Sequence, residues 1–175
     1  VCAMVRKWEW KFVDELCWMR NPPPGDWPNR FKNAFEPIYH FALDKIVFRP
    51  SSVSSQGKGR STHDKPNSTT GEYYNNLDIS WDESRPSNLL DIKAAAGAQN
   101  IGHAAAFPVA LPDFFIRAYS DPGDVWLDTF LGSGTTIVAA HNNKRVGLGI
   151  EKLPKYLGVI LERLSEVVGV KPVRL

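Results

Sequence analysis

The sequence has little cysteine and histidine and no long apolar run. Its 175 residues include 2 cysteines and 4 histidines, and no two cysteines have Cys-x-x-Cys spacing. These numbers exclude a disulfide framework and predict no metal site. No apolar stretch approaches the roughly 20 residues of a membrane-spanning helix. Charge appears at Arg6, too early for a secretory signal. We therefore expect a soluble, cytoplasmic protein with no membrane partner.

The composition is that of one ordinary globular domain. Apolar residues make up 43% of the chain and charged residues 23%, which excludes collagen-like, fibrous and wholly disordered proteins. The net charge is only +2, and residues 1–60 hold ten Lys and Arg against six Asp and Glu. This excess is a weak indication of a polyanionic partner, and a solvated surface is the simpler explanation.

The first fifty residues predict a few strands. Residues 8–20 are rich in aromatic and β-branched types and end at three prolines, which predicts one strand. Apolar and polar residues alternate in two further runs, 37–43 and 46–48, which predicts two short strands. Apolar residues at helical spacing within 31–38 leave a helical turn open as an alternative.

A polar segment follows. From residue 50 to residue 76, Ser, Thr, Gly and Asn make up 15 of 27 residues, and no apolar periodicity survives. We expect a long loop here, mobile over residues 51–72 when the chain is free of a partner, because little apolar surface is available to offset the ordering entropy. Lys58, Arg60 and Lys65 are candidates for phosphate contacts in this loop, although solvated disorder is the better explanation on composition alone.

The final third predicts a βαβ unit with a right-handed crossover. The expected elements are an amphipathic helix at 110–120, a buried strand at 125–130, a helix at 135–143 that hydroxyl residues can cap, a strand at 145–151 and a helix across 157–168.

A glycine loop joins the first of these strands to its helix. Gly132 and Gly134 allow the backbone to turn sharply and approach a ligand at the start of a helix. Glu151 ends the following strand, 23 residues after Asp128. A doubly wound fold presents a carboxylate in this position to the hydroxyls of a ribose. The ligand is therefore expected to contain a nucleoside.

Departures from known nucleotide-binding motifs limit which class of nucleoside ligand fits the loop. The sequence lacks GxxxxGK[ST], so no lysine reaches a triphosphate. The third glycine of GxGxxG is replaced by Ile137, which accommodates the pyrophosphate of NAD less well. Asp128 would repel a pyrophosphate and suits the ammonium group of a methionine moiety. S-adenosylmethionine fits better than NAD, and an ordinary glycine turn remains the alternative.

The same residues carry a family resemblance. The stretch SDPGDVWLDTFLGSGTTIVAAHNNKRVGLGIEKLPKYLGVILERL resembles the cofactor region of the DNA amino-methyltransferases, whose pattern is close to DPFxGSGTT. Thr129 stands in place of the proline of this pattern. The upstream stretch GHAAAFPVALPDFFI resembles the segment that precedes the loop in this family, with Ala104 in place of a proline. Residues 10–42 resemble the strands and the Trp-containing turn that flank the target-base pocket.

The resemblance implies an α/β fold, namely a Rossmann-like S-adenosylmethionine-dependent methyltransferase sheet that is incomplete and carries a long variable loop region. Residues 1–49 would flank the target base, residues 50–102 would form a variable region associated with target recognition, and residues 103–175 would form the cofactor-binding unit. The implied activity is methyl transfer to N6 of adenine or N4 of cytosine in double-stranded DNA, as in restriction-modification systems of prokaryotes or phages. The base is flipped out of the duplex for this chemistry.

The resemblance also assigns residues. Those expected to bind S-adenosylmethionine are His103, Phe107, Asp128, Phe130, Gly132, Ser133, Gly134, Thr135 and Glu151. Those expected to contact DNA phosphates are Arg20, Arg30, Lys32, Lys58 and Arg60, each also explained as a surface charge.

The catalytic tetrapeptide of the family, a polar residue followed by Pro-Pro and an aromatic, is missing. Asn21 begins the run NPPP, which ends in proline, lies in the wrong segment and is interpreted as a turn. In the family subgroup with this motif order, the tetrapeptide would precede Val1, so the chain is expected to be truncated, to lack central strands and to be inactive alone. The catalytic residues are therefore unassigned. Two alternatives stay open: a non-catalytic module that needs a partner chain, and a nicotinamide-dependent oxidoreductase fragment, which Ile137 disfavours.

Overall fold

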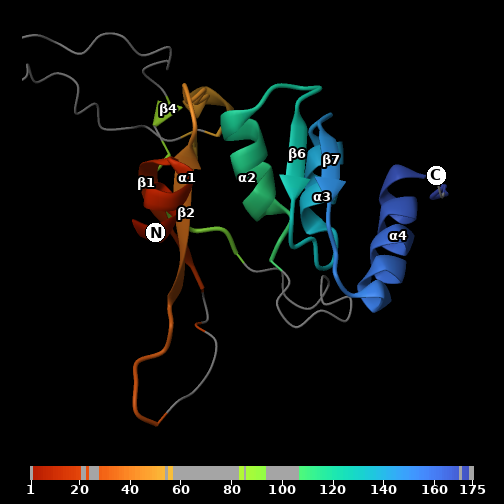
Figure 1. Ribbon diagram of the computed structural model, residues 1–175, viewed down its shortest axis with the longest axis horizontal. Helices are drawn as coiled ribbons and strands as arrows, with labels where there is room; N and C mark the ends of the chain where they lie inside the picture. Colours follow the sequence, from red (N-terminus) through yellow and green to blue (C-terminus); the bar gives the residue numbers. More distant parts are fainter. Residues whose placement is uncertain are drawn as a thin grey trace, which may run out of the picture.

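The computed structural model describes residues 2–20, 23, 28–53, 55–56, 83–84, 86–93, 107–169 and 171–173. Helix α2 (Ala110–Tyr119) lies between two groups of strands, a hairpin sheet on one side and a parallel pair on the other (Figure 1). The rest of the polar segment, including most of residues 51–72 and their predicted mobility, lies outside the described residues. No described helix is both long and apolar enough to cross a bilayer.

The hairpin sheet is formed by β1 (Lys11–Met19) and β2 (Phe35–Ala42), which pair antiparallel with a register shift between Phe12 and Asp14. The two-residue strand β5 (Leu89–Leu90) pairs parallel with the other edge of β1. The ring N–H of Trp18 donates to the carbonyl oxygen of Ile92 at 2.7 Å. This contact ties the predicted strand within residues 8–20 to a segment more than seventy residues later.

The first core cluster lies between this sheet and α2. The buried side chains are Leu16, Trp18, Leu90 and Leu111. The second cluster lies on the opposite side of α2, where Ile116 packs with Ala139 and Ala140. Helix α2 therefore buries two faces and joins the two halves of the molecule.

The N-terminal part differs from the sequence prediction at one expected strand, and it also settles an open alternative and adds a helix. Residues 45–49 have no regular structure, so the strand expected at 46–48 does not form. The run instead packs on the end of α2, with the Phe48 and Tyr119 rings 5.3 Å apart. The helical turn left open as an alternative within 31–38 does not form, and β2 starts at Phe35. A short helix, α1 (Cys2–Trp8), was not predicted.

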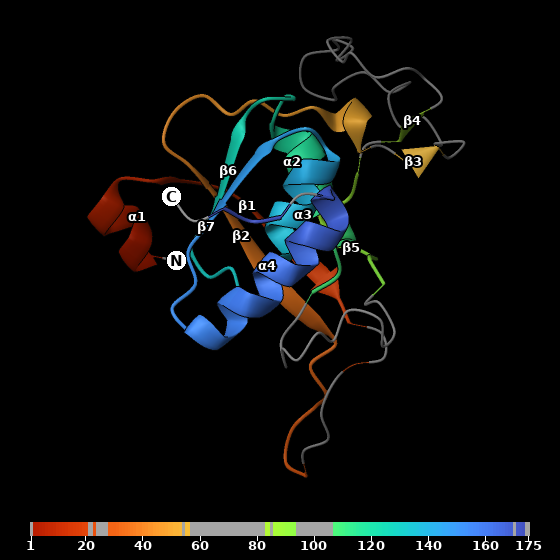
Figure 2. The ribbon, with the colours of Figure 1, turned by 90° about the vertical axis from the view of Figure 1, so that its right-hand side faces the viewer.

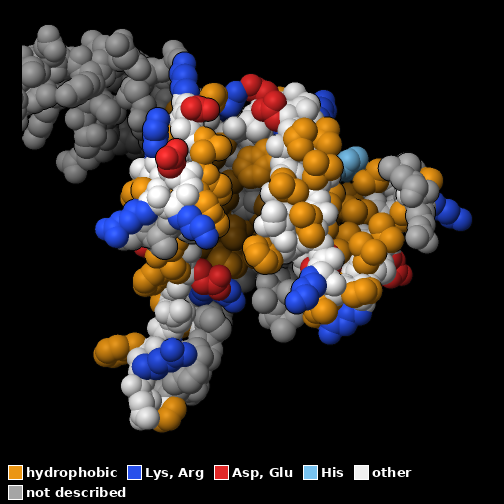
Figure 3. Space-filling view, in the orientation of Figure 1, with side chains coloured by type: hydrophobic (Ala, Val, Ile, Leu, Met, Phe, Trp, Pro, Cys, Tyr) orange, Lys and Arg blue, Asp and Glu red, His pale blue; other side chains and the backbone are white. Residues whose placement is uncertain are grey.

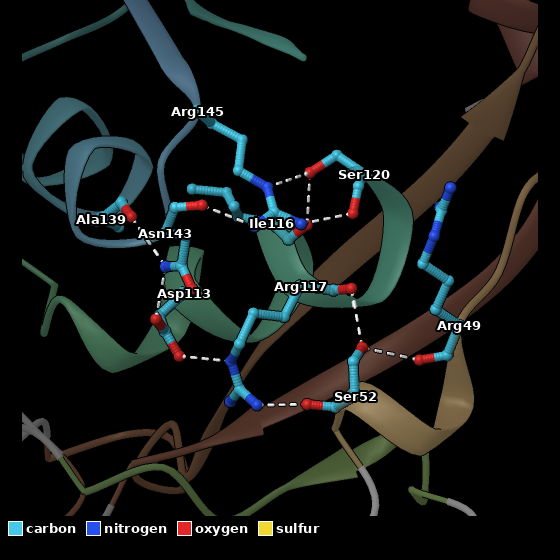
Figure 4. Close-up of polar contacts among 9 residues, drawn as sticks. All are labelled: Arg49, Ser52, Asp113, Ile116, Arg117, Ser120, Ala139, Asn143 and Arg145. Atoms are coloured by element: carbon cyan, nitrogen blue, oxygen red, sulfur yellow. Dashed lines mark hydrogen bonds and ion pairs between the residues drawn. The ribbon is translucent and has the colours of Figure 1, made fainter. Parts of the chain in front are cut away.

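A polar network holds the segment after β2 against α2 (Figure 4). The short 3-10 helix η1 (Pro50–Ser52) places the Ser52 hydroxyl 2.7 Å from the carbonyl oxygen of Arg117, and the Arg117 guanidinium donates to the Ser52 carbonyl. Arg117 also pairs with Asp113 at 2.9 Å, and Asn143 donates to Asp113 at 2.7 Å. The network thereby connects η1, α2 and the helix that follows the glycine loop. Beyond η1, β3 (Ser55–Gln56) and β4 (Glu83–Ser84) form a two-residue antiparallel pair.

The C-terminal part is the predicted βαβ unit. Strands β6 (Val125–Asp128) and β7 (Val146–Gly149) are parallel, α3 (Thr135–Asn142) connects them, and α4 (Pro154–Val168) follows. The loop packs closely against β7 at Gly149, where a Cβ would lie 2.5 Å from a methyl carbon of Leu131, so a larger residue would need the Leu131 side chain to move. Figure 2 shows α2 and α3 on one side of the two strands.

A strand forms within residues 125–130 as predicted, but the prediction that it is buried was wrong. Val125 and Leu127 are 60% and 58% exposed, and Val146 and Leu148 on β7 are also exposed. These four side chains occupy the face opposite α3, and apolar surface is visible there in Figure 3. Within the described part of the chain, β6 pairs only with β7, and nothing covers this face.

Candidate cofactor-binding site

The glycine loop turns tightly between the end of β6 and the start of α3. Gly132 and Gly134 have φ angles of 55° and 80°, in the left-handed region that favours glycine. The N–H of Gly134 donates to the carbonyl oxygen of Leu131 at 2.9 Å, and the N–H of Leu131 donates to that of Ile150 at 3.0 Å. The loop is thus held both internally and against the end of β7.

Two carboxylates lie beside this loop, at the carboxyl ends of the two parallel strands. Asp128 accepts hydrogen bonds from the Phe130 N–H at 2.9 Å and from the Thr136 hydroxyl at 2.6 Å. Glu151 accepts one from the Gly132 N–H at 2.9 Å and one from the N–H of residue 153 at 2.8 Å. These bonds fix the orientation of both carboxylates. The structure therefore brings Asp128, Gly132, Gly134 and Glu151 together, as the sequence predicted.

The hydroxyl residues at the start of α3 do not cap it. The N-cap position is Gly134, and no side chain makes a capping hydrogen bond. Ser133 and Thr135 are buried, and their hydroxyl oxygens lie 3.2 Å apart. The prediction of capping was therefore wrong, because the helix starts at Thr135, one residue earlier than a cap by the Thr135 hydroxyl would require. The assignment of Ser133 and Thr135 to cofactor binding stays a prediction.

Arg163 is a residue at this site that sequence reasoning missed. It projects from α4 and its Nη1 atom donates to the Ser133 carbonyl oxygen and the Thr135 hydroxyl, both at 3.0 Å. Its side chain is buried, and this burial lowers the pKa of the guanidinium. An arginine within an amphipathic helix pattern is ordinarily interpreted as solvated, so no signal in the sequence pointed to this contact.

The remaining predicted cofactor residues lie in different settings. Phe130 is 89% exposed and presents its ring to solvent from the loop. Phe107 packs against the first core cluster, which α2 shares with the hairpin sheet. His103 lies outside the described residues. The roles of all three stay predictions.

The predicted DNA-contacting residues are spread over the hairpin. Arg20 pairs with Glu36, and its guanidinium carbon lies 4.8 Å from the centre of the Trp18 ring. Arg30 and Lys32 are exposed between β1 and β2. Lys58 and Arg60 lie outside the described residues. The described part of the chain contains no cluster of three or more His, Cys, Asp or Glu side chains that could hold a metal ion.

The chain matches the DNA methylase family over residues 1–162. It is 30% identical over 137 residues to the type II methyltransferase M.PvuII of Proteus hauseri, which covers 75% of this chain and 40% of that protein. It is 49% identical over 59 residues to the type II methyltransferase M.BglI of Bacillus subtilis, which covers 34% of this chain and 17% of that protein. The crystal structure of the M1.HpyAVI–SAM complex superposes with a TM-score of 0.61 and 25% identity, over 93% of this chain and 66% of that chain. The chain spans less than half the length of the two curated relatives.

Proposed function

Since the chain belongs to the DNA methylase family, we propose that it forms the cofactor-binding part of an enzyme that transfers a methyl group from S-adenosylmethionine to DNA. The acceptor is an exocyclic amino group, N6 of adenine or N4 of cytosine. The observation that carries the proposal is the glycine loop between two oriented carboxylates, Asp128 and Glu151. The TM-score of 0.61 with a methyltransferase structure agrees with the predicted Rossmann-like fold.

The residues present fit this cofactor. Both carboxylates lie at the carboxyl ends of adjacent parallel strands, where open α/β sheets bind ligands. Asp128 would attract the ammonium group of the methionine moiety, and Glu151 would accept hydrogen bonds from the ribose hydroxyls. The exposed ring of Phe130 offers an apolar surface beside the loop. When bound, S-adenosylmethionine supplies an electrophilic methyl group on a positively charged sulfur.

The chain's own residues would bind and orient the cofactor and would form no covalent intermediate. The bonds from Gly132 and Thr136 hold the two carboxylates in place before a ligand arrives. Such preorganisation reduces the ordering cost of binding. It also fixes the direction from which an acceptor nitrogen can approach.

In this proposal the target base comes from double-stranded DNA. A further polypeptide segment, in cis or in trans, holds that base beside the cofactor. The 175 residues contain no Pro-Pro-aromatic tetrapeptide. A groove of about 490 Å³ runs along β6, lined by Tyr119, Ser120, Asp124, Val125, Trp126 and Leu127. Figure 3 shows a hollow between the hairpin side and the β6–β7 side of the molecule. Among the described residues nothing pairs with the outer edge of β6, and this edge and the exposed apolar face beside it support the addition of a further segment here.

Calorimetric titration tests the cofactor assignment. We expect S-adenosylmethionine and S-adenosylhomocysteine to bind and NAD to bind more weakly or not at all. Glu151→Ala should weaken S-adenosylhomocysteine binding by about 1.5–3 kcal/mol, the value of hydrogen bonds to a charged group. Glu162→Ala, an exposed change on α4, is the matched control. Tighter binding of NAD than of S-adenosylmethionine would overturn the assignment, and an unchanged dissociation constant in Glu151→Ala would move the ribose elsewhere.

A further inference from the structure

Arg163 is the only charged side chain among the described residues that is buried, with 8% of its surface exposed. It reaches the loop from α4, one turn after Ile160, whose side chain would lie 3.2 Å from a Cβ placed at Gly134. Within the described part of the chain no carboxylate pairs with it, and its recorded partners are the oxygens of Ser133 and Thr135. A charged group is therefore buried against the loop without a counter-charge in contact.

Burying a charged group costs free energy of folding. Desolvation disfavours the charged form, which is why the pKa of Arg163 is lowered. An apolar side chain of similar size would fill the same space without this cost. The presence of a charged arginine here is thus explained by the hydrogen bonds that its guanidinium makes to the loop.

Arg163 holds one particular peptide group. The Ser133 carbonyl accepts a hydrogen bond from Arg163 at 3.0 Å. On the other side of the same peptide bond, the Gly134 N–H donates to the Leu131 carbonyl at 2.9 Å. Because the carbonyl and N–H of a trans peptide point in opposite directions, the two bonds fix the plane of this peptide. That plane sets the left-handed conformation of Gly134, from which α3 begins.

We propose that Arg163 is a positioning residue for cofactor binding, acting through the Ser133–Gly134 peptide and the Thr135 hydroxyl. The proposal rests on the proposed function, because it concerns the same loop. It assigns to α4 a part in forming the pocket, in addition to packing.

The first test is calorimetry with S-adenosylhomocysteine at a temperature well below the melting transition of every variant. R163M keeps side-chain bulk and removes the charge and the hydrogen bonds, and it should raise the dissociation constant about tenfold or more. R163K should recover part of the affinity at neutral pH. The control is E162Q, an exposed change one residue away. A purely structural role would lower the melting temperature of R163M and leave the affinity of the folded protein unchanged, which would overturn the proposal.

The pH dependence of binding by R163K separates the effect of the charge at position 163 from the effect of side-chain shape. It does not need R163M to fold or to bind. A lysine buried at this position has a lowered pKa and loses its charge well before an arginine does. From about pH 7 to about pH 9.5, the dissociation constant of R163K should therefore rise several-fold relative to that of the wild type. Parallel pH profiles for the two proteins would show that the charge has no role.

Amide hydrogen exchange tests the effect of Arg163 on the loop without any bound ligand. The amides of Gly134 and of the first turn of α3 should exchange faster in R163M or R163K than in E162Q, because their peptide loses one of its two constraints. If the wild type does not bind S-adenosylhomocysteine, the proposed function fails, and loop exchange still decides the role of Arg163. Unchanged exchange in both Arg163 variants would overturn it.

Discussion

His40 on β2 places a titratable ring against α2. Its ring centre lies 4.7 Å from that of Tyr119, and its Nδ1 atom is buried with no hydrogen-bond partner among the described residues. Burial lowers the pKa of His40 from 6.5, and the nearby charge of Asp14 opposes this in smaller measure. The folded protein therefore binds a proton at His40 less tightly than the unfolded chain does.

The sign of this shift predicts a loss of stability in acid. The contribution of neutral His40 is fully present above pH 6.5 and decreases as the pH falls through 6.5 towards the lower folded-state pKa. The melting temperature of His40→Gln should fall less between pH 7 and pH 5 than that of the wild type. His141→Gln, an exposed change on α3, is the control and should follow the wild type. An equal or steeper fall in His40→Gln would contradict the prediction.

Single residues were predictable where spacing alone fixes their place. Asp128 ends β6 and Glu151 follows the end of β7 by two residues, so the topology of a βαβ unit brings them together whatever the packing. Arg163 was not predictable, because its contact depends on the angle at which α4 crosses the loop. The mistaken cap had a similar cause: Thr135 and Thr136 both fit a cap in the sequence, and only the backbone shows that Gly134 takes the position.

At the scale of elements, α2 joins the two halves of the molecule. One face contributes Leu111 to the cluster with the hairpin sheet, and the other contributes Ile116 to the cluster with α3. Ile116 is fully buried, whereas Leu43 after β2 is 61% exposed. The two residues therefore form a matched pair for measuring what α2 contributes to stability.

Ile116→Ala should destabilise the protein by about 2–5 kcal/mol, the range for removing a buried aliphatic side chain and leaving a cavity. Leu43→Ala should change stability by less than about 0.5 kcal/mol. Urea denaturation followed by tryptophan fluorescence gives both values. A loss in Ile116→Ala no larger than that in Leu43→Ala would mean that the contact between α2 and α3 contributes little.

Elements with long or well-bounded patterns were predictable. Helix α4 shows apolar residues at helical spacing, and the turns at glycines bound β6 and α3, so both ends of the βαβ unit were placed closely. Short runs were not. Residues 46–48 alternate as a strand does, yet Phe48 packs on Tyr119, and among the described residues no strand pairs with the run.

At the scale of the whole molecule, the described residues leave apolar surface uncovered. The exposed side chains of β6 and β7 read in the sequence as those of buried strands, since parallel strands are normally covered on both faces. The sequence of β6 and β7 therefore suits strands that are covered on both faces. The described residues cover only the face that packs against α3. The groove along β6 lies at the same place.

This arrangement predicts how methyl transfer depends on a further segment. An acceptor nitrogen must be held within near-attack distance of the methyl group while its base is flipped and stacked. The 175 residues contain no Pro-Pro-aromatic tetrapeptide to do this. We therefore expect the purified chain alone to transfer no methyl groups to mixed-sequence duplex DNA. A segment carrying such a tetrapeptide, fused or added as a second chain, should restore transfer.

The assay follows radiolabelled S-adenosylmethionine into DNA, with Gly132→Trp as the control that blocks the glycine loop. Gly132 has a φ of 55° and its N–H is bonded to Glu151, so a bulky side chain there should abolish cofactor binding. Restored transfer that also requires Gly132 would place the cofactor at this loop and the base-holding group on the added segment. Sustained incorporation by the chain alone, lost in Gly132→Trp, would instead mean that the base-holding residues lie within these 175 residues in a pattern other than the tetrapeptide.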